Sequence, residues 1–223
     1  MKIVAYYTSD DIYHEHFLIL KKNLQGFNLD YFFKKIEPNS WLSVTSFKPK
    51  FIKNCLDQFQ DDILYIDIDC IIHNDISVYF NELDENIHIA AHKNEDELLS
   101  GVVFFRDSKQ SQKILDMWIE GMEKNPSVWD QKVLERIIKD NDIQFYNLPV
   151  SFLYIFDKSK IDHPNLKPVI EHLQASREKK FQEKNFSVKY KILKYIGIKP
   201  KVGKYLHNRR VKMNEVREKY LIK

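Results

Sequence analysis

The segment from Asp62 to Ile72, with the sequence DILYIDIDCII, is the feature that most constrains the fold of this chain. An apolar run of this length, bounded by the acidic pair Asp61-Asp62, is typical of a strand buried in an α/β sheet. Asp67 and Asp69 lie at the carboxyl end of that strand, which is the edge of an open α/β sheet where ligands bind. The segment therefore predicts a buried strand with a binding site beside it.

Two neighbouring carboxylates at such a position require a compensating charge. Burying two unpaired negative charges has a large free-energy cost, and a divalent cation would offset that cost. Mg²⁺ and Mn²⁺ prefer oxygen ligands and are usually held by one or two carboxylates together with substrate phosphates. Asp67 and Asp69 therefore predict a metal–phosphate site. The alternative is a strand-end turn in which backbone amides cap both side chains.

Hydrophobic periodicity and capping residues predict strands that alternate with helices. The alternation indicates an α/β fold with a largely parallel sheet and helices on both faces. We expect a catalytic domain over residues 1–180 and a C-terminal extension over residues 181–223. The expected strands are 2–7, 29–33, the D-x-D strand, 87–91, 102–105, 143–146 and a short one at 169–170, and the expected helices are 10–24, 50–59, 108–122 and 129–139, with a loop over 41–49.

The composition places the chain among soluble globular proteins. Its 43% hydrophobic and 30% charged residues are ordinary for that class. No segment approaches the roughly 18–20 continuous apolar residues of a membrane span, and the N-terminal residues resemble a strand, with no signal-peptide pattern. Cys55 and Cys70 do not make a disulfide framework. We therefore expect a cytoplasmic protein.

Several short motifs are spread over residues 1–180. In chain order they are Tyr6-Tyr7-Thr8, Trp41, Phe47-Lys48-Pro49, Leu64 to Asp69, Ser100-Gly101-Val102, Trp129-Asp130-Gln131 and Glu171 to Arg177. Their order and spacing resemble those of the GT-A-fold nucleotide-diphospho-sugar transferases, and most closely the D-x-D enzymes related to glycosyltransferase family 8. The resemblance implies a Rossmann-like GT-A fold. It also implies transfer of a sugar from a nucleotide-diphospho-sugar, in particular a UDP-sugar, to a saccharide, lipid-linked or other hydroxyl acceptor.

The resemblance also implies the metal ligands. In such enzymes the D-x-D carboxylates bind Mn²⁺ or Mg²⁺, which neutralises charge on the leaving nucleoside diphosphate. Asp69 would be the main ligand, and Asp67 would bind the metal or the ribose hydroxyls. His172 matches the histidine that completes the coordination in the family, although a single histidine can also be structural. An imidazole among oxygen ligands would favour Mn²⁺ over Mg²⁺.

Residues for the nucleotide and diphosphate follow from the same resemblance. Thr8 and Asp10 would hold the base and ribose, and Asp10 can also cap the helix that follows. Lys48 precedes the D-x-D strand where related enzymes place a basic residue that contacts the donor. Arg177 and Lys179 would clamp the diphosphate, or would form an ordinary solvated basic face.

Two further motifs would face the transferred sugar. Gly101 lets the backbone approach the donor, since glycine has no side chain in the way, and Ser100 stands where many relatives carry Asn. Asp130 and Gln131 match the pair that family members direct at the sugar and acceptor. Asp130 would bind sugar hydroxyls, act as a general base, or cap the next helix. Family 8 implies retention of the anomeric configuration, whereas a base at Asp130 would give inversion.

The C-terminal residues carry a different charge balance from the rest. Residues 177–223 hold 16 Lys and Arg but 4 Asp and Glu. Basic and aromatic residues over 185–212 suit an interfacial helix on an anionic membrane, which would place the protein on the inner membrane face. Binding of nucleic acid, as in a glycosyltransferase for modified DNA bases, and a helix packed on the core are the two alternatives.

A different enzyme class also uses a D-x-D motif after an apolar strand. Haloacid-dehalogenase-type phosphatases use the first aspartate as a nucleophile, but they place the motif near the N-terminus. They usually carry Thr or Val two residues after the second aspartate, where this chain has Ile71. The sequence therefore favours the transferase over the phosphatase.

Overall fold

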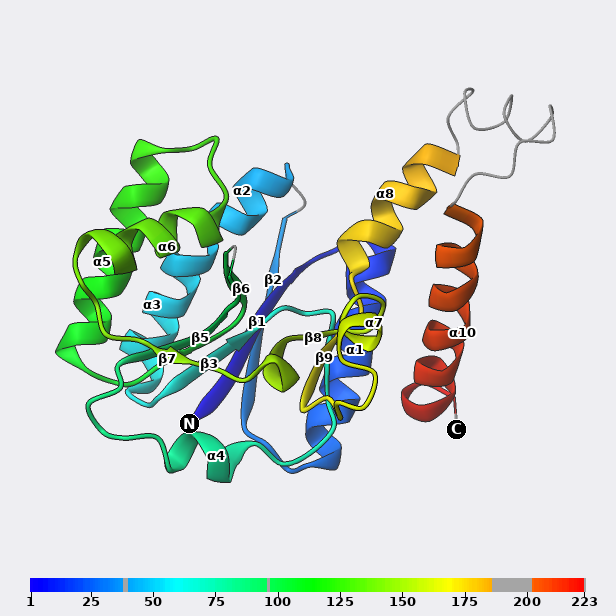
Figure 1. Cartoon of the computed structure of the whole chain (residues 1–223), viewed down its shortest axis with the longest axis horizontal. Coiled ribbons are helices and arrows are strands. Elements are labelled where there is room, and N and C mark those ends of the chain that lie inside the picture. Colours follow the sequence, from blue (N-terminus) through cyan, green and yellow to red (C-terminus); the bar gives the residue numbers. More distant parts are fainter. Residues whose placement is uncertain (38–39, 96, 186–201, 223) are drawn as a thin grey trace.

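The computed structural model describes residues 1–37, 40–95, 97–185 and 202–222. Its centre is a six-stranded sheet with the order β2-β1-β3-β6-β5-β7 in the described part of the chain (Figure 1). β6 is antiparallel to β3 and β5, whereas the other neighbouring pairs are parallel. The expected mostly parallel sheet is confirmed. Its strands are β1 (Lys2–Thr8), β2 (Tyr31–Ile36), β3 (Ile63–Ile66), β5 (Ile89–Lys93), β6 (Leu98–Phe105) and β7 (Tyr146–Asn147).

Alternating side chains of the central strands form two cores, one on each face of the sheet. In β1, Val4 and Tyr6 contribute to one core, whereas Ile3 and Ala5 contribute to the other. This division follows from the two-residue repeat of a strand, and both faces are apolar because both are covered.

Helices cover the two faces (Figure 1). The core that contains Tyr6 is closed by α3 (Lys48–Phe59), α5 (Lys109–Lys124) and α6 (Asp130–Asp140). The core that contains Ile3 is closed by α1 (Asp11–Gly26), α4 (Ser77–Asn81) and the short 3₁₀ helix η1 (Val150–Leu153). The predicted α/β arrangement with helices on both faces is therefore confirmed.

The long apolar segment is divided between two sheets. β3 ends at Ile66, and Cys70 begins β4 (Cys70–Ile72) in a second sheet with β9 (Ile170–His172) and β8 (Tyr154–Ile155). The Cys70 amide donates to the Asp67 carbonyl at 3.1 Å, which closes a turn between the sheets. Asp67 and Asp69 therefore lie in a tight turn that follows β3.

Several predicted boundaries of helices and strands were wrong. Residues 41–49 do not form a loop: Ser40 caps the short helix α2 (Trp41–Ser46) by accepting from the Ser43 amide at 3.2 Å. α3 begins at Lys48, two residues early, because proline is well suited to the first helical turn. β6 begins before Ser100, so the Ser-Gly pair lies inside the strand. β2 and β7 overlap their predicted ranges but are shifted towards the C-terminus.

The C-terminal part packs on the body of the molecule. After β9, α8 (Ala175–Asn185) follows, and α10 (Val202–Tyr220) lies against α1 (Figure 1). Met213 and Val216 of α10 share a small core with Ile19, Ile71 and Leu173. The described residues of the extension therefore form a packed helix, which was the third alternative for this segment. The predicted membrane-binding stretch 185–212 lies largely outside the described residues, and the domain boundary at 180 stays a prediction.

No helix among the described residues is both long and apolar enough to cross a bilayer. The remaining described helix, α7 (Ser159–Asp162), is a single turn near β8.

Candidate active site

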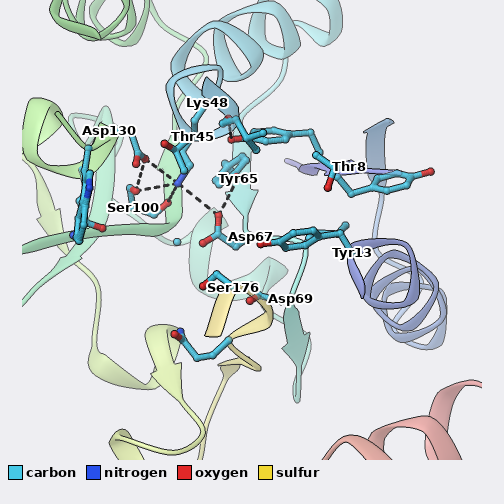
Figure 2. Close-up of a pocket in the computed structure, with 18 residues that line it drawn as sticks. Thr8, Tyr13, Thr45, Lys48, Tyr65, Asp67, Asp69, Ser100, Asp130 and Ser176 are labelled. Carbon is cyan, nitrogen blue, oxygen red and sulfur yellow. Dashed lines mark hydrogen bonds and ion pairs between the residues drawn. The ribbon is translucent and has the colours of Figure 1, made fainter. Parts of the chain in front are cut away.

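A pocket opens where β1 and β3 end, and most of the predicted site residues line it. Figure 2 shows Thr8 and Tyr13 at one end, Ser100 and Asp130 at the other, and the D-x-D aspartates between them. The pocket lies at the carboxyl edge of the parallel strands, as expected for an open α/β sheet. Its lining residues are Tyr6, Tyr7, Thr8, Tyr13, Val44, Thr45, Lys48, Tyr65, Asp67, Ile68, Asp69, Ser100, Gly101, Trp129, Asp130, Gln131, Gln174 and Ser176.

Hydrogen bonds fix the two D-x-D carboxylates in different ways. The Tyr65 hydroxyl donates to Oδ1 of Asp67 at 2.9 Å. Oδ2 of Asp69 accepts from the Ala175 amide, the first of α8, at 2.7 Å, and the Asp69 carbonyl accepts from the Leu173 amide at 2.8 Å. Asp69 therefore connects the turn after β3 to the segment between β9 and α8.

Lys48 lies behind the D-x-D turn as a buried cation. Its ammonium is 3.0 Å from Asp130 and 3.5 Å from Asp67, and it donates to the Ser100 hydroxyl at 2.9 Å and the Ser100 carbonyl at 3.0 Å. Burial alone would lower the pKa of Lys48, but the two carboxylates outweigh it and raise that pKa above its ordinary value. Lys48 therefore stays charged and joins both sides of the pocket.

His172 lies beside the D-x-D turn in a closely packed space. A Cβ atom at Gly101 would be 2.7 Å from His172 Cε1 and 3.0 Å from Asp67 Oδ2, so only glycine fits there. Burial lowers the pKa of His172, although Asp69 and Asp67 oppose that shift. The imidazole is therefore neutral at pH 7, which is the form that binds metals.

The donor atoms around His172 suit a divalent cation. Asp69, Cys70 and His172 each offer one atom, and these atoms lie within 4.8 Å of one another. The Cys70 sulfur is 3.4 Å from His172 Nδ1, because the two residues are paired on adjacent antiparallel strands. Desolvation raises the pKa of Asp67; Lys48 opposes that shift, and the nearby charge of Asp69 adds to it. The carboxylate of Asp69 and the neutral imidazole of His172 are ligand types that Mn²⁺ accepts, and Asp67 lies in the same turn.

The other end of the pocket is formed where β1 meets α1. Thr8 donates to Asp10 at 2.6 Å, and the Tyr13 amide donates to Asp10 at 3.3 Å, so Asp10 is the N-cap of α1. Hydrogen bonds from Thr8 and Tyr13 and the charge of Lys179 outweigh desolvation and lower the pKa of Asp10. Thr8 and Tyr13 line the pocket, whereas Asp10 supports them from behind.

Two predicted phosphate-binding residues form ion pairs beside the pocket. Arg177 is 2.8 Å from Asp157, and Lys179 is 3.4 Å from Asp10. Neither Arg177 nor Lys179 is among the residues that line the pocket, although both side chains are more than 40% exposed. In this structure they lie next to the site without entering it.

At the end opposite Thr8, the first turn of α6 supplies polar groups. Oδ2 of Asp130 accepts from the Ser100 hydroxyl at 2.7 Å, and Trp118 donates to the Asp130 carbonyl at 3.0 Å. Gln131 donates to Glu97 at 2.9 Å. Trp129 precedes them and is 50% exposed at the pocket. This end therefore combines fixed polar groups with an accessible aromatic surface.

Sequence reasoning assigned no role to several residues of this region. Tyr65 could have been found, because residues i and i+2 of a strand share a face and Tyr65 precedes Asp67 by two. Tyr13, Gln174 and Ser176 line the pocket from other elements, and Cys70 reaches His172 only through strand pairing. No local pattern identifies the last four.

A family model described as nucleotide-diphospho-sugar transferase matches residues 11–186. No curated protein matches the chain in sequence.

Solved structures of glycosyltransferases are similar in fold. One, involved in the glycosylation of the major capsid of PBCV-1, has a TM-score of 0.64 and 15% identity, over 82% of this chain and 98% of that one. GlyE of Streptococcus pneumoniae TIGR4 has a TM-score of 0.53 and 19% identity, over 77% of this chain, which spans about half of GlyE (53%). The galactosyltransferase LgtC, solved with donor and acceptor sugar analogs, has a TM-score of 0.50 and 15% identity, over 77% of this chain and 86% of LgtC. These likenesses confirm the predicted GT-A fold.

Proposed function

Because the chain belongs to the nucleotide-diphospho-sugar transferase family, we propose that it transfers a sugar from a UDP-sugar to a saccharide acceptor in a reaction that depends on Mn²⁺. The observation that carries this proposal is the arrangement of the pocket. The D-x-D carboxylates lie between an end with the backbone and hydroxyl of Thr8 and an end with Ser100 and Asp130 (Figure 2). A nucleotide, its diphosphate and its sugar require these three environments in that order.

The nucleoside is assigned to the end of the pocket at β1. Thr8 and the ring of Tyr13 supply a hydroxyl and an aromatic surface there. Asp10 holds the Thr8 hydroxyl and the Tyr13 backbone amide through its hydrogen bonds, so this turn is ordered before the ligand binds. Preformed contacts avoid the entropic cost of ordering side chains during binding.

The diphosphate is assigned to the D-x-D turn. Asp67, Asp69 and His172 would hold the cation, with Asp69 oriented by the Ala175 amide. When bound, the cation would supply positive charge to the phosphate oxygens that become more negative as the donor breaks down. Arg177 and Lys179 lie in the first turns of α8 and are exposed enough to add charge after a change of rotamer.

The sugar is assigned to Ser100, Gly101, Asp130 and Gln131. Oδ2 of Asp130 pairs with Lys48 and accepts a hydrogen bond from Ser100. We therefore assign the other oxygen, Oδ1, to a sugar hydroxyl. Without a side chain, Gly101 lets the backbone approach the anomeric carbon of the sugar, and a Cβ there would collide with His172. An acceptor hydroxyl forms the new bond to that carbon, and its proton passes to the departing diphosphate. The bond to the diphosphate breaks, and its electron pair leaves with the nucleoside diphosphate.

The acceptor is assigned to the mouth of the pocket at Trp129. The apolar face of a sugar ring can pack on an exposed indole, while its hydroxyls meet the polar side chains of the α6 turn. A lipid-linked saccharide presents the same ring and hydroxyls as a free one. The proposal therefore concerns the saccharide part of the acceptor.

Thermal unfolding with a panel of nucleotide-sugars, each with and without Mn²⁺, tests the function. A ligand that binds only the folded state raises the unfolding temperature by mass action, so a UDP-sugar at 100 times its Kd adds about 2.7 kcal/mol. We expect a rise that requires both Mn²⁺ and one UDP-sugar, and release of UDP from that donor. A rise with a GDP- or CMP-sugar instead would reject the UDP assignment, and no rise with any donor would reject the function.

A further inference from the structure

A helix outside the family match reaches the backbone of the site. The family model ends at residue 186, whereas α10 begins at Val202. Arg209 of α10 is 3% exposed, although arginine is almost never fully buried unless it is paired. Its burial against the body of the molecule indicates a specific role.

The Arg209 guanidinium contacts three separate segments of the chain. It donates to Glu178 of α8 from two nitrogens, at 2.9 and 2.5 Å, and to the backbone carbonyl of Leu173. A third contact, 3.5 Å, reaches Nε2 of His16 on α1. A planar guanidinium can satisfy several partners in fixed directions at once, which lysine cannot do.

The Leu173 peptide connects Arg209 to the D-x-D turn. While its carbonyl accepts from Arg209, its amide donates to the Asp69 carbonyl at 2.8 Å. Gln174 follows with a left-handed φ of 58°, and the Ala175 amide then donates to the Asp69 carboxylate at 2.7 Å. A non-glycine residue in this conformation is strained and persists only where its surroundings hold it. Arg209 holds both the peptide before this bend and Glu178 in the helix after it.

A second cation of α10 supports the same strand. Lys212 is 2.7 Å from Glu171, which also contacts His73 at 2.9 Å. Glu171 is the neighbour of His172 in β9, and Met213 packs on Leu173 within the small core. One face of α10 therefore contacts residues 171, 173 and 178, which surround the predicted ligand His172.

We propose that Arg209 is a positioning residue for the metal site: by fixing the Leu173 carbonyl and Glu178, it holds the bend that places Asp69 and His172. This inference rests on the proposed function, because the two side chains act as metal ligands only within it. Side chains that orient metal ligands typically contribute 10–100-fold to metal affinity. Arg209 acts through the backbone and touches neither the donor nor the acceptor.

The test compares Arg209→Met with Arg217→Met, both in the full chain. Arg217 lies on the same helix and pairs with Glu15 of α1 at 2.9 Å, so its loss also weakens the packing of α10. Mn²⁺ affinity is measured directly, from the electron paramagnetic resonance signal of free Mn²⁺ without any nucleotide. We expect Arg209→Met to weaken Mn²⁺ binding by about tenfold or more, and Arg217→Met to leave it unchanged. Equal affinities in wild type and Arg209→Met, or equal losses in both variants, would overturn the proposal.

Arg209→Lys keeps the positive charge and provides the test if Arg209→Met does not fold. The lysine can pair with Glu178 but cannot serve Glu178 and the Leu173 carbonyl in the same geometry. We expect it to fold and to bind Mn²⁺ more weakly than wild type. An Arg209→Lys protein with wild-type Mn²⁺ affinity would show that charge alone suffices and would reject the positioning role.

The same measurements separate this inference from the proposed function. If the wild type binds Mn²⁺ but no nucleotide-sugar, the proposed function fails while the comparison of Mn²⁺ affinities still tests Arg209. If the wild type binds no Mn²⁺ but transfers sugar without metal, the inference about Arg209 fails and sugar transfer stands.

Discussion

The ammonium of Lys48 lies 3.0 Å from the carboxylate of Asp130, and both side chains are 5% exposed. Lys48 starts α3 and Asp130 starts α6, so this ion pair joins two helices that are far apart in the sequence. Neither charge has bulk water to solvate it. The two charges compensate each other, and contacts with Ser100 and Asp67 further offset the cost of their burial.

Lys48→Met should therefore reduce the free energy of unfolding strongly. Removing one partner of a buried ion pair leaves an uncompensated charge and costs about 3–5 kcal/mol. Urea unfolding of both proteins measures the difference. Lys53→Met is the control, because Lys53 forms a surface pair with Asp116 at 2.9 Å, and such pairs contribute about 0–1 kcal/mol. Similar losses in the two variants would contradict the role assigned to Lys48.

Asp69→Asn should abolish Mn²⁺-dependent transfer while the fold is kept. The Asn side-chain oxygen can still accept from the Ala175 amide, so the turn retains its hydrogen bond. The negative charge that a cation requires is lost. Mn²⁺ titration measures metal affinity, and a thermal unfolding curve without metal measures the stability of the fold. An assay for UDP release measures the transfer activity. Full activity of this variant in the presence of EDTA would exclude the proposed metal mechanism.

Gly101→Ala should lower both the free energy of unfolding and the affinity for Mn²⁺. The new Cβ would lie 2.7 Å from His172 Cε1, so the imidazole must move. Overpacking of this kind costs about 1–3 kcal/mol. Gly26→Ala is the matched control, since a Cβ there meets no atom within 4 Å. Crystal structures and Mn²⁺ titrations of both variants check the prediction, and an unmoved His172 in Gly101→Ala would refute it.

His16 should make the protein less stable in acid. Burial lowers its pKa and Arg209 adds to that shift, while Asp69, Glu178 and Glu15 oppose it. In the unfolded chain, histidine titrates near its ordinary pKa of about 6.5. Below that pH the unfolded state binds a proton that the folded state does not, so stability falls as the pH decreases. His16→Gln, which keeps an acceptor for Arg209, should show a smaller loss between pH 7.5 and 5.5 in urea unfolding. If the free energy of unfolding falls equally with decreasing pH in His16→Gln and in wild type, His16 is not a source of acid sensitivity.

Trp129→Ala should raise the KM for the acceptor and leave the KM for the donor unchanged. Loss of an aromatic contact of about 0.5–1.5 kcal/mol corresponds to an increase of about two- to tenfold in the KM for the acceptor. Trp129→Phe keeps an aromatic face and should retain most of the affinity. Transfer kinetics and donor hydrolysis without acceptor are measured for each variant. Equal changes in the KM for donor and acceptor would place Trp129 outside the acceptor site.

Local patterns predicted the parts of the fold that depend on neighbours in the sequence. The cap at Asp10, the helix predicted from residue 108 and the apolar strand before Asp67 all rest on patterns within a few residues. The short helix α2 was missed, although Ser40 supplies its cap, because a single capping residue before six residues is a weak signal. The division of the D-x-D segment between two sheets was also missed, since an apolar run does not show which partner each half pairs with.

The sequence by itself determined the α/β class and, through the order and spacing of its motifs, the family of the protein. It also predicted a site at the end of β3, because a buried strand followed by paired carboxylates is a local pattern. Only the tertiary structure decided which distant groups meet there. The packing of Gly101 against His172, the burial of Lys48 beside Asp130 and the reach of Arg209 to Leu173 join segments separated by many residues. Such contacts arise from the packing of whole elements, and the sequence around each residue holds no record of its partner.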